Sequence, residues 1–217
     1  MQADIERILI DRDTIASRVR ELAQEITRDL CGDDPAACTL PGGPASGGIT
    51  FIPILTGGFI FAADLIRQLP LMMQIRLISV SSYPGTATSS RGARLREELT
   101  TLPQSLEGTH VIVIDDILDS GQTLKLVTGV LQERNPASVR TCVLLRKQRP
   151  EAMATHVDYL AFDIPDEFVV GYGLDYDDYY RNLPDIATLR PHVYGGTSEP
   201  QATPSPSAAG PSSSPRP

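Results

Sequence analysis

Apolar residues recur along this chain with two different periods, and each period predicts a different element. Helical spacing, with charged residues between the apolar ones, occurs over 11–30. A helix that is apolar on most sides is predicted over 59–69, and a further helix over 122–134. Short and almost continuous apolar runs predict buried strands at 49–55, 74–83, 111–115 and 139–145, with shorter candidates at 157–162 and 168–172. Because strands alternate with helices, we expect an α/β fold with a mainly parallel central sheet flanked by helices.

Single residues refine these boundaries. Asp13 or Thr14 is suited to begin the first helix, because a short polar side chain can cap a helix N-terminus. Pro53 is unfavourable inside a strand, since it has no N–H for the ladder, so we expect it in an exposed or terminal part of its strand. Residues 31–48 are rich in Gly and Pro and predict a surface loop or hairpin.

The composition changes at Gly195. Pro, Ser, Ala and Gly dominate residues 195–217, which have almost nothing to bury and cannot offset their chain entropy by packing. We therefore predict a disordered tail there, with a Pro-rich docking peptide as the alternative. Residues 1–194 are expected to form one domain, since a chain of 217 residues is long enough for one domain with a proper core.

Composition and charge exclude several classes of function. A net charge of −8 disfavours a nucleic-acid binder, which normally carries a basic field. We expect no membrane span and no signal peptide, because no apolar run is long enough and the N-terminus lacks a basic start. Cys31, Cys38 and Cys142 show no zinc-ligand or redox spacing. An odd number of cysteines without a disulfide framework is typical of a protein in the reducing cytosol.

The run V-I-V-I-D-D-I-L-D-S-G-Q-T-L, residues 111–124, carries the most specific chemistry in the chain. A buried strand leads into Asp115 and Asp116, and Asp119 precedes a small, hydroxyl-rich turn before a helix. The backbone N–H groups of such a turn and of the helix N-terminus present partial positive charge to an anion. The acids suit the hydroxyls of a sugar or a hydrated Mg²⁺ ion. The alternative is that a hydroxyl of the turn merely caps the helix.

This run resembles the phosphoribosyl-pyrophosphate (PRPP) signature of the type I phosphoribosyltransferases. The resemblance implies the fold of that family, with a small hood subdomain formed by the N-terminal segment and roughly residues 150–194. It also implies PRPP as a substrate, Mg²⁺ as the cofactor and Asp119 as the catalytic base for purine N7. The residues that it assigns to PRPP and its 5′-phosphate are Asp115, Asp116, Asp119, Ser120, Gly121, Gln122 and Thr123.

A second turn is consistent with the same family. Leu55-Thr56-Gly57-Gly58 joins a strand to a helix, and its glycines let backbone amides approach an anion closely. Taken alone, it is an ordinary tight turn. The resemblance assigns Leu55, Thr56 and Gly57 to pyrophosphate binding, and makes the Leu55–Thr56 bond a candidate for a non-proline cis peptide. Many relatives have a lysine where Thr56 stands, so a cation for the pyrophosphate is missing here.

A long polar loop follows the pair Ser82-Tyr83. The loop covers 84–94, and a loop of this length inside a compact domain is usually functional or mobile. It resembles the flexible loop of the family, which closes over the active site with Ser82 and Tyr83 at its front and excludes water from the ribosyl donor. The alternative is a solvated hairpin tip.

The purine side of the site is implied by the C-terminal half. Lys147, in the basic cluster 146–149, matches the residue whose ammonium meets the 6-oxygen and N7 of a purine, although basic residues at a strand end are often only solvated. The block F-V-V-G-Y-G-L-D-Y resembles hypoxanthine-guanine phosphoribosyltransferases. It implies Phe168 as the stacking ring and Val169 as a backbone contact to the base. Arg181 is assigned to pyrophosphate, and the metal ligands are assigned to Asp115, Asp116 and Asp175. The neighbouring tyrosines are predicted mainly to pack: Tyr172, Tyr176, Tyr179 and Tyr180.

The resemblance spans roughly residues 10–190 and implies a purine-salvage enzyme. Such an enzyme moves the 5-phosphoribosyl group from PRPP to N9 of hypoxanthine or guanine and releases pyrophosphate. A non-catalytic, nucleotide-sensing regulator on the same scaffold is the alternative, and a pyrimidine acceptor is disfavoured by Phe168 and Lys147. The family implies a cytoplasmic homodimer or homotetramer that binds PRPP and a 6-oxopurine, without nucleic acid or membrane partners.

Overall fold

A mainly parallel sheet forms the centre of the computed structural model, which describes residues 1–36, 38–40, 42–82, 93–96 and 100–194. Within these residues seven strands join in the order β5-β4-β2-β6-β7-β8, with β3 beside β2. Only the β4–β5 pair is antiparallel among these described pairings. The strands are β2 (Ile49–Leu55), β3 (Gln74–Ile75), β4 (Ile78–Ser82), β5 (Ala93–Leu95), β6 (His110–Leu118), β7 (Ser138–Lys147) and β8 (Tyr159–Ile164). The predicted fold class is confirmed.

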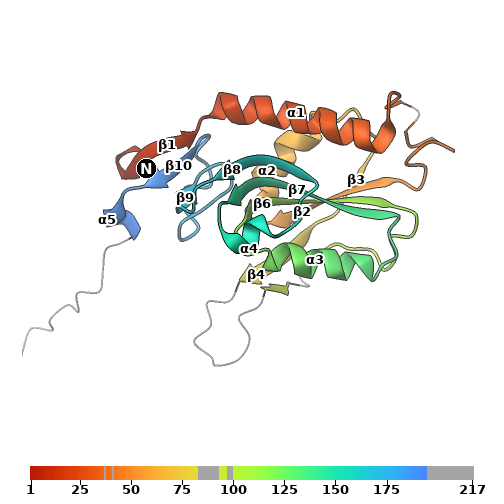
Figure 1. The fold of residues 1–217 in the computed structure, drawn as a ribbon. Helices are drawn as coiled ribbons and strands as arrows, with labels where there is room; N and C mark the ends of the chain where they lie inside the picture. The colour runs from red at the N-terminus through yellow and green to blue at the C-terminus, as the bar shows by residue number, and fades with distance from the viewer. Residues whose placement is uncertain (37, 41, 83–92, 97–99, 195–217) are drawn as a thin grey trace, which may run out of the picture.

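Helices cover both faces of this sheet. Figure 1 shows α1 along one face and α3 along the opposite face, with α2 on the same side as α1. A short 3-10 helix, η1, precedes the first strand. The helices are η1 (Gln2–Asp4), α1 (Arg12–Cys31), α2 (Gly58–Ile66), α3 (Gln122–Gln132), α4 (Pro150–Met153) and α5 (Pro191–Tyr194).

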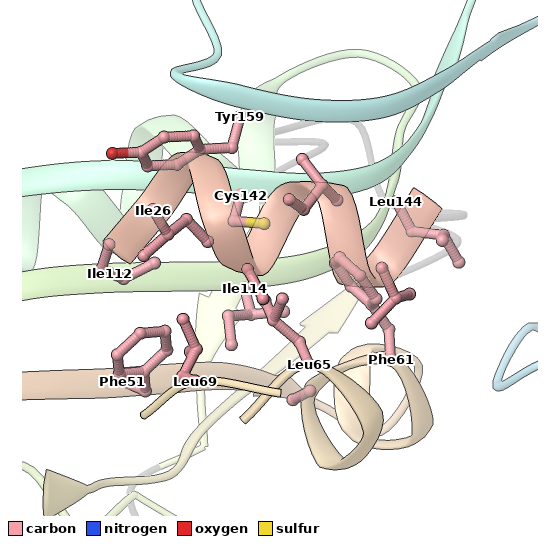
Figure 2. Packing of buried hydrophobic residues seen from close by; sticks show 14 of the residues in the cluster. Ile26, Phe51, Phe61, Leu65, Leu69, Ile112, Ile114, Cys142, Leu144 and Tyr159 are labelled. Carbon is pink, nitrogen blue, oxygen red and sulfur yellow. The ribbon is translucent and has the colours of Figure 1, made fainter. Parts of the chain in front are cut away.

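Alternate residues of one strand supply two separate cores. Along β6, Ile112 and Ile114 face the cluster formed with α1 and α2, whereas Val111 and Val113 face the cluster formed with α3. Figure 2 shows the first cluster, where Ile114 lies among the side chains of the two helices. A strand that is buried on both faces has a continuous run of apolar residues. The sequence therefore predicted β6 from its apolar run.

The two ends of the chain form a second sheet, beside the N-terminal end of α1 (Figure 1). Its antiparallel order is β1 (Ile5–Ile10), β10 (Ile186–Leu189) and β9 (Val169–Val170). Strands β1 and β10 were not predicted, because the pairing joins residues about the whole length of the chain apart. The division into a domain of 1–194 and a tail of 195–217 stays a prediction.

The expected position of Pro53 is wrong. Pro53 is buried inside β2, between β4 and β6 in the sheet. On one side Pro53 pairs with Ile114 of β6. On the other side, β2 changes its partner strand from β3 to β4 at this point. Thr50 and Phe51 pair with β3, whereas pairing with β4 starts only at Ile54. The proline therefore occupies a break in the ladder, where an N–H donor is not needed.

The start of the first helix also differs from the prediction. Asp11, rather than Asp13 or Thr14, is the N-cap of α1. Its carboxylate accepts hydrogen bonds from the backbone N–H groups of Asp13 and Thr14, at 3.0 and 2.9 Å, and from the Thr14 hydroxyl at 2.8 Å. Asp11, Asp13 and Thr14 each suit the cap, so spacing alone left the choice open.

The expectation about the cysteines is wrong in one respect. Cys31 and Cys38 form a disulfide that links the last residue of α1 to the following loop. Both side chains are buried, so the loop predicted over 31–48 is attached to the core at its beginning. Cys142 is a free, buried thiol in β7, and burial raises its pKa. The paired cysteines are seven positions apart, a spacing that has no motif of its own.

No helix in the described part of the chain is long and apolar enough to span a membrane. Tyr83 and most of the loop 84–94 lie outside the described residues, as does the tail 195–217. The predictions of a closing loop and of a disordered tail therefore remain predictions. Ser82 is the last residue of β4.

Candidate active site

The predicted site residues meet where the parallel strands β2, β6 and β7 end. In an open α/β sheet, ligands bind beyond the C-terminal ends of the strands. A hollow of about 320 Å³ opens there, formed by the turn after β2, the end of β6 and the first turn of α3. Its lining includes eight predicted residues: Leu55, Gly57, Asp115, Asp116, Asp119, Ser120, Gly121 and Thr123.

Two adjacent carboxylates form the floor of this hollow. Asp115 is only 4 % exposed, and β6 continues past the pair as far as Leu118 rather than ending at Asp115. Burial raises the pKa of Asp115 well above its usual range, and the charge of Asp116 acts in the same direction. Burial also raises the pKa of Asp116, although the charge of Arg181 opposes that shift. A cation bound here would relieve the repulsion between the two acids.

The turn predicted to bind phosphate leads directly into α3. Gly121 is the N-cap of this helix, with a left-handed φ of 75°, and it has no side chain that could cap the helix. The alternative, that a hydroxyl of this turn serves as the cap, is therefore wrong. A Cβ at Gly121 would lie 2.5 Å from Thr155 Oγ1, so both the backbone angle and the neighbour favour glycine. Ser120, Gly121 and Thr123 line the hollow, so the start of α3 borders it, as a phosphate site at a helix N-terminus requires.

The turn after β2 lies directly against the acid pair. The Leu55–Thr56 peptide bond is cis, as the family resemblance implied. A Cβ at Gly57 would lie 1.8 Å from Asp116 Oδ2, so any side chain there would displace the Asp116 carboxylate. Gly173 in turn lies against the carbonyl oxygen of Gly57, since a Cβ there would come within 2.3 Å of it. Thr56 is exposed at the tip of the turn.

Of the predicted purine contacts, Lys147 reaches a residue that lines the hollow, whereas Phe168 and Val169 lie outside its lining. Lys147 is the last residue of β7, and its Nζ lies 3.5 Å from Asp119 Oδ2. Phe168 is 43 % exposed, and its ring makes an edge contact with Tyr176 at 5.7 Å between ring centroids. Val169 is buried in β9 of the second sheet. The structure therefore places the lysine beside the predicted base and leaves Phe168 partly exposed.

Asp175 and Arg181 form an ion pair with each other. Arg181 Nη2 lies 2.7 Å from Asp175 Oδ1, and its Nη1 donates to the carbonyl oxygen of Gly173 at 2.8 Å. Because Gly173 also touches Gly57, this pair is connected to the turn after β2. The described residues contain no cluster of three potential metal ligands, so Asp175 does not join Asp115 and Asp116 in a preformed centre.

Two charged residues near Asp119 were not predicted as part of the site. Arg149 Nη1 donates to Asp119 Oδ1 at 2.5 Å, and its Nε lies 3.4 Å from Asp166 Oδ2. The sequence showed Arg149 only as one residue of a basic cluster, and nothing in it singled out Asp166.

Among the tyrosines predicted mainly to pack, Tyr179 is 70 % exposed, so its predicted packing role is wrong.

The fold and the site together define a class of protein that binds a phosphorylated sugar beside paired acids. The phosphoribosyl transferase domain family matches residues 9–177 of this chain. The chain therefore belongs to the phosphoribosyltransferase family, as its PRPP-like run predicted.

Similar proteins within that family include hypoxanthine-guanine phosphoribosyltransferases from several bacteria. The hypoxanthine-guanine phosphoribosyltransferase of Mycobacterium avium is 41 % identical over 193 residues, which are 88 % of this chain and 89 % of that protein. The protein of the same name from Streptococcus pneumoniae is 35 % identical and covers 89 % of this chain and 98 % of its own length. A crystal structure of a hypoxanthine phosphoribosyltransferase from Staphylococcus aureus superposes with a TM-score of 0.75 at 35 % identity, covering 89 % and 96 % of the two chains.

Proposed function

We propose that this chain transfers the 5-phosphoribosyl group from PRPP to N9 of hypoxanthine or guanine, giving IMP or GMP and pyrophosphate. Its family and the names of its relatives support a purine-salvage transferase. The observation that carries the proposal is the distance of 3.5 Å between Lys147 Nζ and Asp119 Oδ2 at the rim of the phosphate-binding hollow. This distance brings a donor for a 6-oxo group and an acceptor for the N7 proton to one position.

The donor sugar is held by the floor of the hollow. The amides of residues 119–123 bind its 5′-phosphate at the start of α3, where the helix dipole favours an anion. Asp115 and Asp116 lie near the ribose hydroxyls. Loss of pyrophosphate builds positive charge on the sugar carbon C1′, which nearby carboxylates stabilise. The pyrophosphate is bound by Leu55, Thr56, Gly57 and Arg181.

The acid pair fits a magnesium ion. A buried carboxylate next to a half-buried one, both with raised pKa values, concentrates negative charge that a divalent cation would offset. Mg²⁺ usually binds one or two carboxylates together with substrate phosphates and waters, so Asp115 and Asp116 suffice on the protein side. Asp175 would hold a second ion close to the pyrophosphate. When bound, the metal neutralises the charge of the departing pyrophosphate.

The acceptor base is held by three residues at the rim. Phe168 stacks on the purine, and the backbone of Val169 meets the 2-position. Lys147 donates to the 6-oxygen, whereas the 6-amino group of adenine would place donor against donor. An unmatched buried polar group costs about 1–3 kcal/mol, so this contact selects 6-oxopurines. Asp119 takes the N7 proton if the base lies within hydrogen-bonding reach.

The surroundings of the enzyme follow from the family. We propose a cytoplasmic homodimer or homotetramer, in which Ser82 and Tyr83 begin a loop that closes over the bound substrates. The net charge of −8 argues against a nucleic-acid partner.

Ultraviolet absorbance tests the proposed reaction directly. Hypoxanthine or guanine is mixed with the protein, Mg²⁺ and PRPP, and the product is identified by chromatography. We expect conversion to the mononucleotide only when PRPP is present. Binding of PRPP without conversion of any purine would instead identify a nucleotide-sensing regulator.

A further inference from the structure

Arg149 occupies one oxygen of the carboxylate that the proposed function uses as a base. Its Nη1 donates to Asp119 Oδ1 at 2.5 Å, whereas Asp119 Oδ2 faces Lys147 Nζ at 3.5 Å. The two oxygens of one carboxylate therefore have different environments. One is held by a guanidinium, and the other points to the side where the purine would bind.

Asp166 completes a ring of four charges around this position. Its Oδ1 lies 3.4 Å from Lys147 Nζ, and its Oδ2 lies 3.4 Å from Arg149 Nε. Each cation in the charge ring (Asp119, Lys147, Arg149 and Asp166) is thus close to both acids. Arg149 lies between Asp119 and Asp166, which limits its freedom to move away from either.

The backbone of Arg149 is also held in place. Its N–H donates to the Lys147 carbonyl oxygen at 2.8 Å, and the N–H of Gln148 donates to the Ile164 carbonyl oxygen at 2.9 Å. Arg149 is moreover the N-cap residue of α4, with an extended backbone. The guanidinium therefore extends from a fixed point between the ends of β7 and β8.

We propose that Arg149 is the positioning residue of Asp119, and that Asp166 holds Arg149 in place. This inference depends on the proposed function, because it concerns the proton transfer of the same reaction. With Oδ1 held by Arg149, Oδ2 is the oxygen that accepts the proton. The N7–H bond breaks, an O–H bond forms at Asp119 Oδ2, and the electron pair of the N–H bond stays on the purine.

The physical reason is the rotational freedom of aspartate. The last torsion of an aspartate side chain has broad minima, and the Asp119 side chain is 43 % exposed. Without Arg149, only Lys147, at 3.5 Å, would restrain its carboxylate. Proton transfer requires an oxygen within hydrogen-bonding distance of N7, and a displacement of about 1 Å costs roughly 100-fold in rate.

Three members of the charge ring are too exposed for their ion pairs to stabilise the fold substantially. The side chains of Asp119, Arg149 and Asp166 are 43, 41 and 47 % exposed. Ion pairs that are this exposed contribute little to the free energy of unfolding, because solvent screens them. A substitution of Arg149 is therefore expected to change the reaction and not the thermal midpoint.

The experiment compares Arg149→Gln with Arg146→Gln. Arg146 forms an ion pair of the same kind with Asp163, at 2.7 Å, one residue before Lys147, but it lies outside the charge ring. We expect Arg149→Gln to lower the single-turnover rate of IMP formation about 10- to 100-fold, with KM for PRPP within about twofold of wild type. Arg146→Gln should keep the wild-type rate, Arg149→Lys should recover part of it, and Asp166→Asn should cause a smaller loss.

Repeating the Arg149→Gln substitution in the Asp119→Asn variant tests whether Arg149 acts through Asp119. In the Asp119→Asn variant no base remains to be positioned, so adding Arg149→Gln should change the rate less than about twofold. An equal loss in both backgrounds, or an unaffected Arg149→Gln enzyme, overturns the inference alone. Absence of PRPP-dependent product from the wild-type protein overturns the proposed function together with it.

Discussion

Arg12 and Asp185 are 173 residues apart in the sequence and share three hydrogen bonds. Asp185 Oδ1 accepts from the backbone N–H of Arg12 at 2.9 Å and from its Nε at 3.1 Å, and Oδ2 accepts from Nη2 at 2.9 Å. Arg12 is the first residue of α1, and Asp185 directly precedes β10. This contact therefore joins the helix that covers the central sheet to the second sheet, which carries Val169.

Asp185→Asn is expected to lower stability in a pH-dependent way. The hydrogen bonds from Arg12 hold the pKa of Asp185 below its ordinary value of 3.8. The folded state therefore gains stability from the ionised carboxylate above about pH 4 and loses it as the pH falls through the lowered pKa. Urea unfolding at pH 7 should show a modestly lower midpoint for the variant, and the difference should shrink below pH 4. A difference that stays constant from pH 7 to pH 3 would contradict this account.

Asp119→Asn is expected to fold normally and to slow turnover strongly. Removing a general base typically costs about 10²- to 10⁴-fold in rate, and Asp119 is too exposed for its loss to unfold the chain. Steady-state rates with hypoxanthine and PRPP, together with a thermal melt, measure both effects. Near-normal turnover would rule out Asp119 as the base.

Lys147→Ala is expected to weaken purine binding more than PRPP binding. The ammonium of Lys147 faces the rim of the hollow, and the phosphate-binding turn does not need it. The lost hydrogen bond to the 6-oxygen is worth about 1–3 kcal/mol, so KM for hypoxanthine should rise between about 5- and 150-fold. Initial rates at varied hypoxanthine and at varied PRPP separate the two constants, and equal rises in both would argue against a role in specificity.

Gly57→Ala is expected to disrupt the pyrophosphate side of the site. The backbone of Gly57 is helical and accepts alanine, but a Cβ would come within 1.8 Å of Asp116 Oδ2. Pyrophosphate and PRPP affinity, measured by calorimetry with Mg²⁺, should therefore fall at least tenfold. Gly129→Ala is the matched control, because no atom lies within 4 Å of its added Cβ. Alanine there should raise the stability of α3 by about 0.5–1 kcal/mol and leave binding unchanged.

Removing the Cys31–Cys38 disulfide is expected to lower stability and spare activity. The bond closes a short loop at the end of α1, and a loop of this size is stabilised by about 2–3 kcal/mol in the chain-entropy description. The double variant Cys31→Ala/Cys38→Ala should melt at a lower temperature and no longer respond to dithiothreitol. Cys142→Ala, which removes the free thiol, should keep the response. A wild-type melt that does not change with the reductant would show that the bond is absent in solution.

The candidate site could be predicted in large part because its residues are local in the sequence. Asp115, Asp116, Asp119 and the turn that follows them all lie within one strand–turn–helix unit, and the structure places them around one hollow. The turn at Leu55 was found in the same way, and the structure places it against Asp116. Local motifs of this kind carry their geometry with them, since backbone conformation is set by neighbouring residues.

Arg149 and Asp166 could not be predicted for the opposite reason. They lie 30 and 47 positions after Asp119 in the chain, and their identities match those of ordinary solvated residues. Only the meeting of the ends of β6, β7 and β8 brings the three together.

The sequence alone determined the class of fold, through the alternation of buried strands with amphipathic helices, and it located the phosphate-binding turn. The tertiary structure decided everything that depends on distant partners. Pro53 is tolerated because the strand beside it changes partner there, β1 and β10 exist as strands because each pairs with the other, and Cys31 meets Cys38 because both are buried at the end of α1. Hydrophobic periodicity records which face of an element is buried, but it does not record which segment covers that face.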